Sequence, residues 1–147
     1  MKYIIDATNA RLGRLATTVA KRSLLGHEIV IVNCEHAIIS GTKKSVEKKW
    51  HERMELGQPS KGPFFSRMPD RFVRRVVRGM LPYKQTRGKD AFGRVQCYLG
   101  VPSEYKNNTL EKLEHADLAS LKGTRFVTVQ QICQYLRTKP LHPAKSG

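Results

Sequence analysis

The chain has 147 residues, a length that suits one domain with a single hydrophobic core. It carries 27 Lys and Arg against 12 Asp and Glu, so its formal net charge is +15 and its pI is about 10.1. This balance favours nucleic acid as the partner, with an anionic membrane surface as the weaker option, and no apolar run approaches the length of a membrane span. The three cysteines lack a C-x-x-C spacing, which argues against a disulfide framework and a zinc site. We therefore expect a reducing, cytoplasmic setting and small buried thiols at Cys34, Cys97 and Cys133.

The first residues predict a βαβ unit. Residues 3–6 are typical of a short buried strand. Residues 10–25 repeat apolar side chains at the i, i+3, i+4 and i+7 spacing of an amphipathic helix, which Thr8 or Asn9 would cap. The β-branched run 29–32 predicts a second buried strand. A strand, a helix and a strand in this order predict that the two strands are parallel.

A polar helix is predicted after the short apolar piece 37–39. It opens at Ser40-Gly41-Thr42 and runs through about Leu56, and the side expected to pack carries Val46, Trp50, Arg53 and Met54. Its first turn combines free N–H groups with the charges of Lys43 and Lys44, which suits a phosphate. The alternative is an ordinary solvated turn whose charge is partly neutralised by Glu47, Glu52 and Glu55.

Residues 57–94 form the most basic part of the chain. The segment 57–69 is rich in glycine and proline and predicts a long extended loop, which in a compact domain is usually functional or disordered. A helix follows and ends near Gly79, and the segment 83–94 predicts a second basic loop. Residues 58–106 hold eleven Lys and Arg against three acids, so we expect the contact surface here.

The helix within residues 67–82 is predicted to have one cationic face. Four arginines at i, i+3, i+4 and i+7 share that face, and these are Arg71, Arg74, Arg75 and Arg78. The opposite face holds Phe72, Val73, Val76, Val77 and Met80. Asp70 is the only acid close enough to pair locally, with Arg74. Guanidinium groups so close repel one another unless something anionic covers them, and their geometry matches phosphate, so the pattern indicates a nucleic-acid backbone.

Aromatic residues stand among these cations, at positions 64, 65, 83 and 92. Rings between cations suit stacking on unpaired bases. Packing at the feet of the two loops is the alternative for each ring.

The last third predicts short elements. A strand over 95–101 is closed by Pro102, and a short helix over 109–121 and a strand at 126–127 follow. Thr128 and Gln131 form a capping box for a last helix whose inward side chains are Val129, Ile132, Cys133 and Leu136. Residues 138–147 are expected to be a tail. Residues 1–147 thus predict one α/β domain.

No pattern predicts catalysis, a cofactor or a metal site. The chain has neither a phosphate-binding P-loop nor a dinucleotide-binding glycine turn. Asp6 lies at a strand end without an evident partner acid or histidine, so we interpret it as a cap. The helix start at 9–14 could bind an RNA phosphate or simply expose Arg11 and Arg14, and the sequence leaves both open.

The hexapeptide Val77-Arg78-Gly79-Met80-Leu81-Pro82 resembles the signature of the large-subunit ribosomal protein thirteen family. Asp6-Ala7-Thr8 with Leu12-Gly13-Arg14-Leu15-Ala16 is similar to the first strand and helix of that family. Ile31-Val32-Asn33 with Ile39-Ser40-Gly41 resembles its second strand and turn. Gly62-Pro63, Arg67, Pro69, Arg71, Arg87-Gly88 and Gly100-Val101-Pro102 resemble its archaeal and eukaryotic branch.

This resemblance implies a three-layer α/β/α fold around a four-stranded, largely parallel sheet, with long basic loops. It also implies a structural constituent of the large ribosomal subunit that binds 23S-type rRNA, supports early assembly and has no enzymatic activity. The implied partners are large-subunit rRNA and neighbouring ribosomal proteins, with no membrane and no small-molecule substrate.

The residues that we nominate for RNA contact are cations in and near the 57–94 region. The first group is Arg71, Arg74, Arg75, Arg78, Lys84, Arg87 and Lys89, and the second is Lys43, Lys44, Lys61, Arg67 and Arg94.

Two rival functions remain. A nucleic-acid-processing enzyme would need clustered carboxylates for metal ions, whereas the acids here are scattered. The other rival is a non-ribosomal RNA- or DNA-binding regulator. A DNA-binding one would prefer duplex DNA and form a dimer, and no helix-turn-helix pattern supports it.

Overall fold

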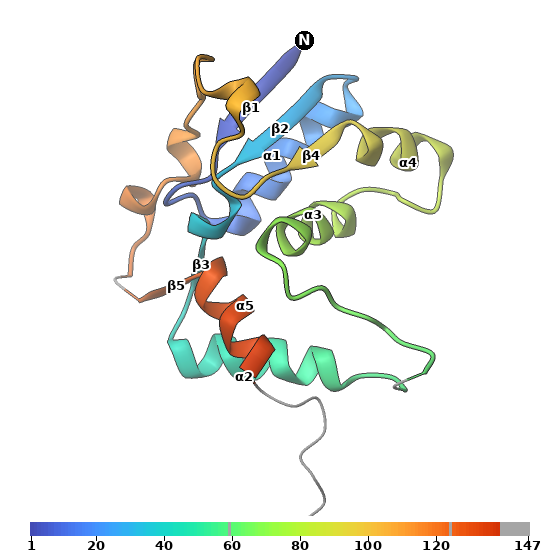
Figure 1. Ribbon diagram of the computed structural model, residues 1–147, viewed down its shortest axis with the longest axis vertical. Coiled ribbons are helices and arrows are strands. Elements are labelled where there is room, and N and C mark those ends of the chain that lie inside the picture. Colours follow the sequence, from blue (N-terminus) through green and yellow to red (C-terminus); the bar gives the residue numbers. More distant parts are fainter. Residues whose placement is uncertain (59, 124, 139–147) are drawn as a thin grey trace, which may run out of the picture.

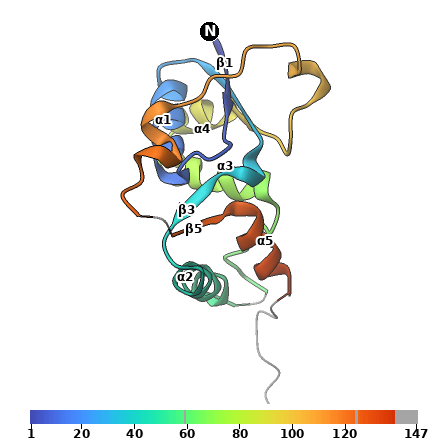
Figure 2. The same cartoon turned by 90° about the vertical axis from the view of Figure 1, so that its left-hand side faces the viewer.

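The computed structural model describes residues 1–58, 60–123 and 125–138 (Figure 1). A parallel sheet with its helices forms the larger part, and a two-stranded sheet packs with two further helices at the other end (Figure 2). The strands are β1 (Lys2–Asp6), β2 (Glu28–Val32), β3 (Ile38–Ser40), β4 (Val95–Cys97) and β5 (Phe126–Thr128). The α-helices are α1 (Leu12–Leu24), α2 (Lys43–Glu55), α3 (Pro69–Gly79), α4 (Thr86–Gly93) and α5 (Val129–Thr138). The 3₁₀ turns are η1 (Cys34–His36), η2 (Ser103–Tyr105), η3 (Glu114–Ala116) and η4 (Leu118–Ser120).

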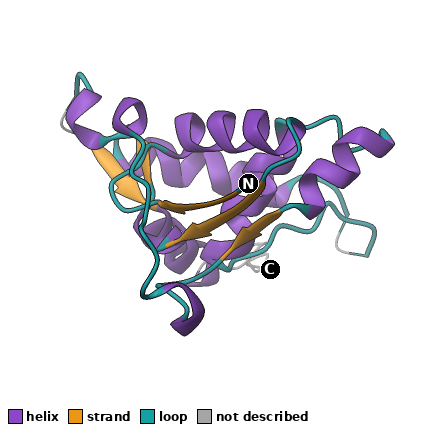
Figure 3. Cartoon of the chain, turned by 90° about the horizontal axis from the view of Figure 1, so that it is seen from above, coloured by secondary structure: helices purple, strands orange, loops and turns teal. Residues whose placement is uncertain are grey.

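The larger sheet has three parallel strands in the order β1-β2-β4 (Figure 3). Ile5 lies opposite Ile31, and Ile31 lies opposite Cys97. The predicted parallel pairing of the first two strands is therefore confirmed. Ile5, Ile29 and Ile31 are fully buried in the core that also holds the apolar side chains of α1 and α3, because alternate residues of a strand point to the same face.

Among the described residues, those that cover the other face of this sheet form no α-helix. Ile4, Val30 and Val32 point to that side and pack in a second core cluster with Tyr105 of η2. The segment between β4 and Glu111 therefore takes the place of the third layer, and the expected α/β/α sandwich is wrong on this face.

The expected four-stranded sheet is also wrong. At the free edge of β1 a single residue, Glu111, makes the next parallel bridge, opposite Ile5. The backbone N–H of Asp6 donates to the carbonyl of Glu111 at 2.9 Å. The N–H of Glu111 in turn donates to the carbonyl of Ile4 at 2.8 Å. The chain then turns away from the edge. The remaining strands, β3 and β5, form a separate antiparallel pair in which Ile39 lies opposite Val127.

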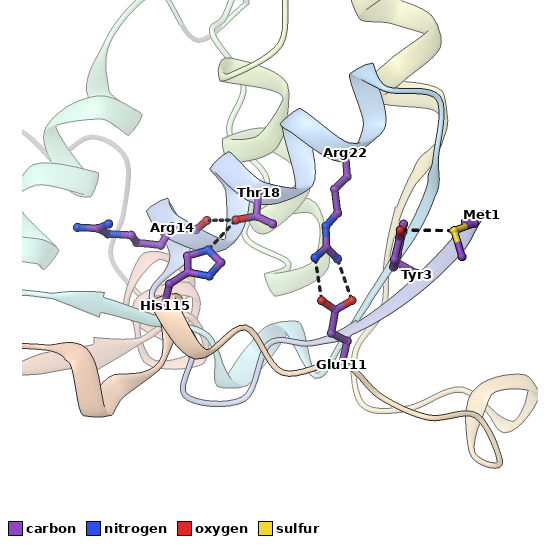
Figure 4. A network of polar contacts seen from close by, with 7 residues as sticks. All are labelled: Met1, Tyr3, Arg14, Thr18, Arg22, Glu111 and His115. Carbon is purple, nitrogen blue, oxygen red and sulfur yellow. Dashed lines mark hydrogen bonds and ion pairs between the residues drawn. The ribbon is translucent and has the colours of Figure 1, made fainter.

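The segment that follows Glu111 is fastened to the outer side of α1 (Figure 4). Arg22 donates two hydrogen bonds, each 2.8 Å, to the two carboxylate oxygens of Glu111. His115 lies 2.8 Å from the hydroxyl of Thr18, one turn earlier on the same helix. The hydrogen bonds from Arg22 lower the pKa of Glu111, and the same contact raises the pKa of Arg22.

Several elements differ from their predictions. The second basic loop contains the helix α4, the strand predicted over 95–101 keeps only its first three residues, and 109–121 holds the turns η3 and η4 instead of a helix. Neither Thr8 nor Asn9 caps α1: its N-cap is Arg11, without a side-chain hydrogen bond. The Thr8 hydroxyl instead donates to Asp6 at 2.7 Å.

Other local predictions are confirmed. Thr42 caps α2 by accepting a hydrogen bond from the N–H of Ser45. The capping box of α5 is complete, since the N–H of Thr128 donates to the Gln131 side chain and the N–H of Gln131 donates to the Thr128 hydroxyl, both at 3.2 Å. The inward side chains predicted for this helix are buried. Of the predicted tail, only Thr138 is described, and it ends α5; residues 139–147 lie outside the described residues.

The cysteines are thiols, as expected. Cys34 and Cys133 are buried, whereas Cys97 is only partly buried. Burial raises the pKa of Cys133 to about 12. A hydrogen bond with Cys97, together with burial, raises the pKa of Cys34.

A glycine is required at position 88, because α4 passes directly over the end of the preceding turn. A Cβ at this position would collide with the carbonyl of Pro82. We expect Gly88→Ala to destabilise the protein by about 2 kcal/mol, the usual range for overpacking. Chemical denaturation followed by circular dichroism measures this. Gly93→Ala, on the same helix with open space around the new methyl group, is the control and should be neutral or stabilising. Equal effects of the two variants would contradict the close approach.

The Arg22–Glu111 pair should make stability depend on pH. Its carboxylate is partly exposed, so we expect Glu111→Gln to cost about 1 kcal/mol at neutral pH. Because the pKa of Glu111 is lowered in the folded state, this contribution is present above its ordinary value of 4.5 and disappears as the pH falls through the folded value. Thermal melts of both proteins between neutral and acidic pH should therefore converge. The exposed Glu114→Gln on the same segment is the control, and a difference that persists in acid would refute the linkage.

Candidate nucleic-acid interface

The arginine helix forms as predicted. Pro69 starts α3 at a position where a missing N–H is harmless. The buried side of α3 holds Phe72, Val73 and Val77, and Val76 is partly buried. Met80 was expected on this side but is 43% exposed, because it follows the last helical residue.

Three arginines of α3 lie over aromatic rings supplied by the flanking segments. The pairs, with the distance from guanidinium carbon to ring centroid, are Arg74 over Phe92 (4.2 Å), Arg75 over Phe65 (3.8 Å) and Arg78 over Tyr83 (4.9 Å). The negative faces of the rings offset part of the repulsion among the arginines. Of the two interpretations of these rings, packing at the feet of the loops is the one that the structure supports for Phe65 and Phe92, which pack against the core, whereas Tyr83 is 40% exposed.

Two of the nominated arginines bind the fold itself. Arg74 Nε donates to the carbonyl of Val95 at 3.3 Å and so joins α3 to β4. Arg94 Nη1 donates at 3.0 Å to the carbonyl of Ser23, in the last turn of α1. Asp70, the one acid close enough to pair with Arg74 on the helix, does not do so, because Arg74 reaches the sheet instead. Within the described residues, Asp70 Oδ1 is buried without a hydrogen-bond partner.

Arg75 fixes the loop between α2 and α3. Its Nη1 donates to the carbonyl of Phe64 at 2.8 Å while its guanidinium covers the ring of Phe65. Burial and the neighbouring Arg78 lower the pKa of Arg75. The ring of Phe64 is left 68% exposed between Lys61 and Arg67. Phe64 is thus the most exposed of the four aromatics and is open for stacking.

The remaining cations of this region face solvent. Arg71, Lys84, Arg87, Lys89 and Lys61 are exposed, and Arg67 is partly buried. Across the part of the chain that the structure describes, none of these six makes an ion pair. Arg71 comes from α3, Arg87 and Lys89 come from α4, and the other three lie in the segments between helices.

Lys43 and Lys44 stand apart from this group, at the start of α2 (Figure 1). Lys43 lies 4.0 Å from Glu47 and Lys48 lies 3.9 Å from Glu52, so the predicted partial neutralisation is confirmed. Lys44 is exposed.

The start of α1 is covered by residues 115–120. The N–H of Arg11 donates to the carbonyl of Ala116, and Arg11 Nη2 donates to the carbonyl of His115 and the hydroxyl of Ser120. Of the two alternatives for this helix start, the structure favours a closed end over a phosphate site. That alternative expected both arginines to be exposed, which is confirmed for Arg14 but wrong for Arg11, which is partly buried.

Asp6 has the expected capping role. One of its carboxylate oxygens accepts hydrogen bonds from the N–H and hydroxyl of Thr8 and from the amide of Asn33. Burial alone would raise the pKa of Asp6, but these hydrogen bonds outweigh it and the pKa is lowered. Asp6 therefore holds the ends of β1 and β2 together as a carboxylate.

The described residues give two further findings. No group of three or more His, Cys, Asp and Glu is placed to hold a metal ion. Within the same residues, no helix is long and apolar enough to cross a membrane.

An α/β core with a cationic surface of exposed arginines and lysines is typical of nucleic-acid-binding proteins. Residues 1–104 match the model of the family described as ribosomal protein L13. The large ribosomal subunit protein uL13 of Methanopyrus kandleri is 45% identical over 135 residues, which cover 90% of this chain and 85% of that protein. The proteins of the same name from Methanococcoides burtonii and Archaeoglobus fulgidus are each 43% identical, over 92% and 90% of this chain and 98% and 86% of their own lengths. The chain belongs to the ribosomal protein L13 family, and it is a structural, non-enzymatic component of the ribosome.

Sequence reasoning missed one group of cations. Lys49 and Arg53 are one turn apart on α2 and line a cleft together with Arg11 and Arg75. The i, i+4 spacing of Lys49 and Arg53 was a visible signal, but the segments that meet at this cleft are far apart in the sequence.

Arg75 should control the order of the 57–68 loop. We expect Arg75→Ala to release the Phe64 carbonyl and speed trypsin cleavage after Lys61 and Arg67 by roughly fivefold, the effect of losing about 1 kcal/mol of local stability. Mass spectrometry of early digests measures the rate at each site. Arg71→Ala, an exposed arginine of the same helix, should leave both rates unchanged. Equal rates for all three proteins would show that the loop is held in another way.

Proposed function

We propose that this chain is a constituent of the large ribosomal subunit that binds large-subunit rRNA mainly through α3, α4 and the loop before α3, and that it supports early assembly of the subunit. The observation that carries the proposal is a set of cations that make no ion pair with any described residue: the exposed Arg71, Arg87 and Lys89 on the two helices, Lys84 in the turn between them, and in the loop the exposed Lys61 and the partly buried Arg67. Family membership supplies the ribosomal setting.

The proposed mechanism is neutralisation and positioning of RNA. Each lysine or arginine on a phosphate releases condensed counterions, and this lets RNA helices approach one another. Phosphate contacts fix the register without reading sequence. Arg78 and Arg75 would contribute through the parts of their guanidinium groups that the rings leave open, whereas Arg74 and Arg94 act mainly inside the protein.

Some specificity would come from unpaired bases. RNA-binding proteins recognise splayed bases by stacking them on aromatic rings. Phe64 offers such a ring, held in place through its own carbonyl by Arg75. Lys43 and Lys44, on the separate start of α2, would meet another part of the RNA or a neighbouring ribosomal protein.

The test reverses charge on α4 and the turn before it. The triple variant Lys84→Glu, Arg87→Glu and Lys89→Glu should weaken binding to large-subunit rRNA and reduce the slope of log K against log salt by about 0.9 for each lost phosphate contact. Filter binding across a salt series, with tRNA and duplex DNA as competitors, measures both quantities. The circular-dichroism melt should change little, because these side chains contact no other described residue through an ion pair.

The control carries the same change of charge elsewhere. Lys21, Lys106 and Lys122 are exposed and lie outside residues 57–94. Their replacement by Glu should reduce binding much less. Equal losses in the two variants would mean that the net charge alone drives binding. Preferential displacement by duplex DNA would favour a regulator of DNA over a ribosomal protein.

A further inference from the structure

A cleft of about 700 Å³ lies between the two parts of the protein. Its walls come from the start of α1, from β3, from α2, from residues 65–66 and from the length of α3. This volume falls within the range of sites that hold small organic ligands. The cations nominated on α4 do not line it, and Arg75 is the one residue that it shares with those nominated for RNA contact.

Every charged residue that lines the cleft is a cation. These residues are Arg11, Lys49, Arg53 and Arg75, and no Asp or Glu is among the lining residues. In the described parts of the chain, none of the four forms an ion pair. The Nε atom of Arg11 is buried without a hydrogen-bond partner. Uncompensated positive charge in a concave site attracts an anionic occupant.

The rest of the cleft is largely apolar and offers flat groups. Trp50 packs on Phe72 with ring centroids 4.5 Å apart, and Arg53 lies over the Trp50 ring at 4.7 Å. Ile39, Val76 and Met80 add aliphatic surface. Nucleic-acid bases stack on aromatic rings and on guanidinium planes, so the lining suits a base beside a phosphate.

We propose that this cleft holds an unpaired nucleotide of single-stranded RNA, with the base against the apolar wall and its phosphates beside Lys49 and Arg53. The proposal rests on the proposed function and adds a second site to it. Charge complementarity selects this occupant: a second copy of this chain, with its net charge of +15, or any basic protein segment would be repelled by the four cations.

The chain contains a built-in reporter, because its only tryptophan, Trp50, lines the cleft. The probe is a short single-stranded oligouridylate, titrated into the full chain while tryptophan fluorescence is followed. We expect saturable quenching, since a base in the cleft would lie close to the indole ring. Heparin, a polyanion without bases, should compete with the probe but should not itself quench. Equal quenching by heparin would reduce the cleft to a general anion site and overturn the proposal.

Two glycines allow the cleft to be filled without changing charge. Gly13 and Gly79 line it, and a Cβ at either position would meet no other atom within 4 Å. The double variant Gly13→Leu and Gly79→Leu should keep its fold, because leucine favours helix over glycine. It should bind the probe about tenfold more weakly, the effect of losing one stacked base, and lose the quenching. Gly123→Leu, at an equally open glycine that does not line the cleft, is the matched control.

Filter binding to large-subunit rRNA separates the two proposals. If the wild-type chain binds rRNA but the oligouridylate gives no quenching, or if the filled variant still quenches fully, the cleft proposal fails alone. If the wild-type chain does not bind rRNA, the proposed function fails as well.

Discussion

Several guanidinium groups on one turn of helix repel one another, and the fold of residues 57–94 is built around this constraint. The rings of Phe65, Tyr83 and Phe92 lie beneath three arginines of α3. Each ring comes from a different segment, so the contacts that reduce the repulsion also fix the loop before α3, the turn after it and the end of α4. The basic face is therefore organised by the protein before any RNA is bound.

Arginines that look equivalent in the sequence have two different roles in the structure. Arg74 and Arg94 donate to backbone carbonyls of the core, whereas Arg71 faces solvent. Helical spacing places Arg71 and Arg74 on one face correctly, but it cannot show that Val95 lies within reach of Arg74. The meeting of Arg11, Lys49 and Arg75 in one cleft was not predicted for the same reason, because these residues come together only after the chain has folded.

Local patterns predicted much of the fold. The periodicity of α1 and α3, the parallel pairing of β1 with β2 and the capping box at Thr128 follow from short-range rules that tertiary structure did not override. The helix α4 was not predicted, since it is eight residues long and holds two glycines, and glycine normally disfavours helix. Gly88 is tolerated because the helix crosses Pro82 too closely for any side chain. The bridge at Glu111 and the pairing of β3 with β5 join residues far apart in the chain, where one sequence carries little signal.

The antiparallel pair β3–β5 has a consequence for how the chain folds. The parallel sheet is complete once Cys97 has been synthesised, and the family match ends soon afterwards, at residue 104. The partner of Ile39 is Val127, and α5 follows it, so the smaller part waits until nearly the whole chain is available. Contacts of such long sequence separation form late because the loop that they close is long. The N-terminal part of a nascent chain can thus present the arginine helix while β3, which forms one wall of the neighbouring cleft, still lacks its pairing strand β5.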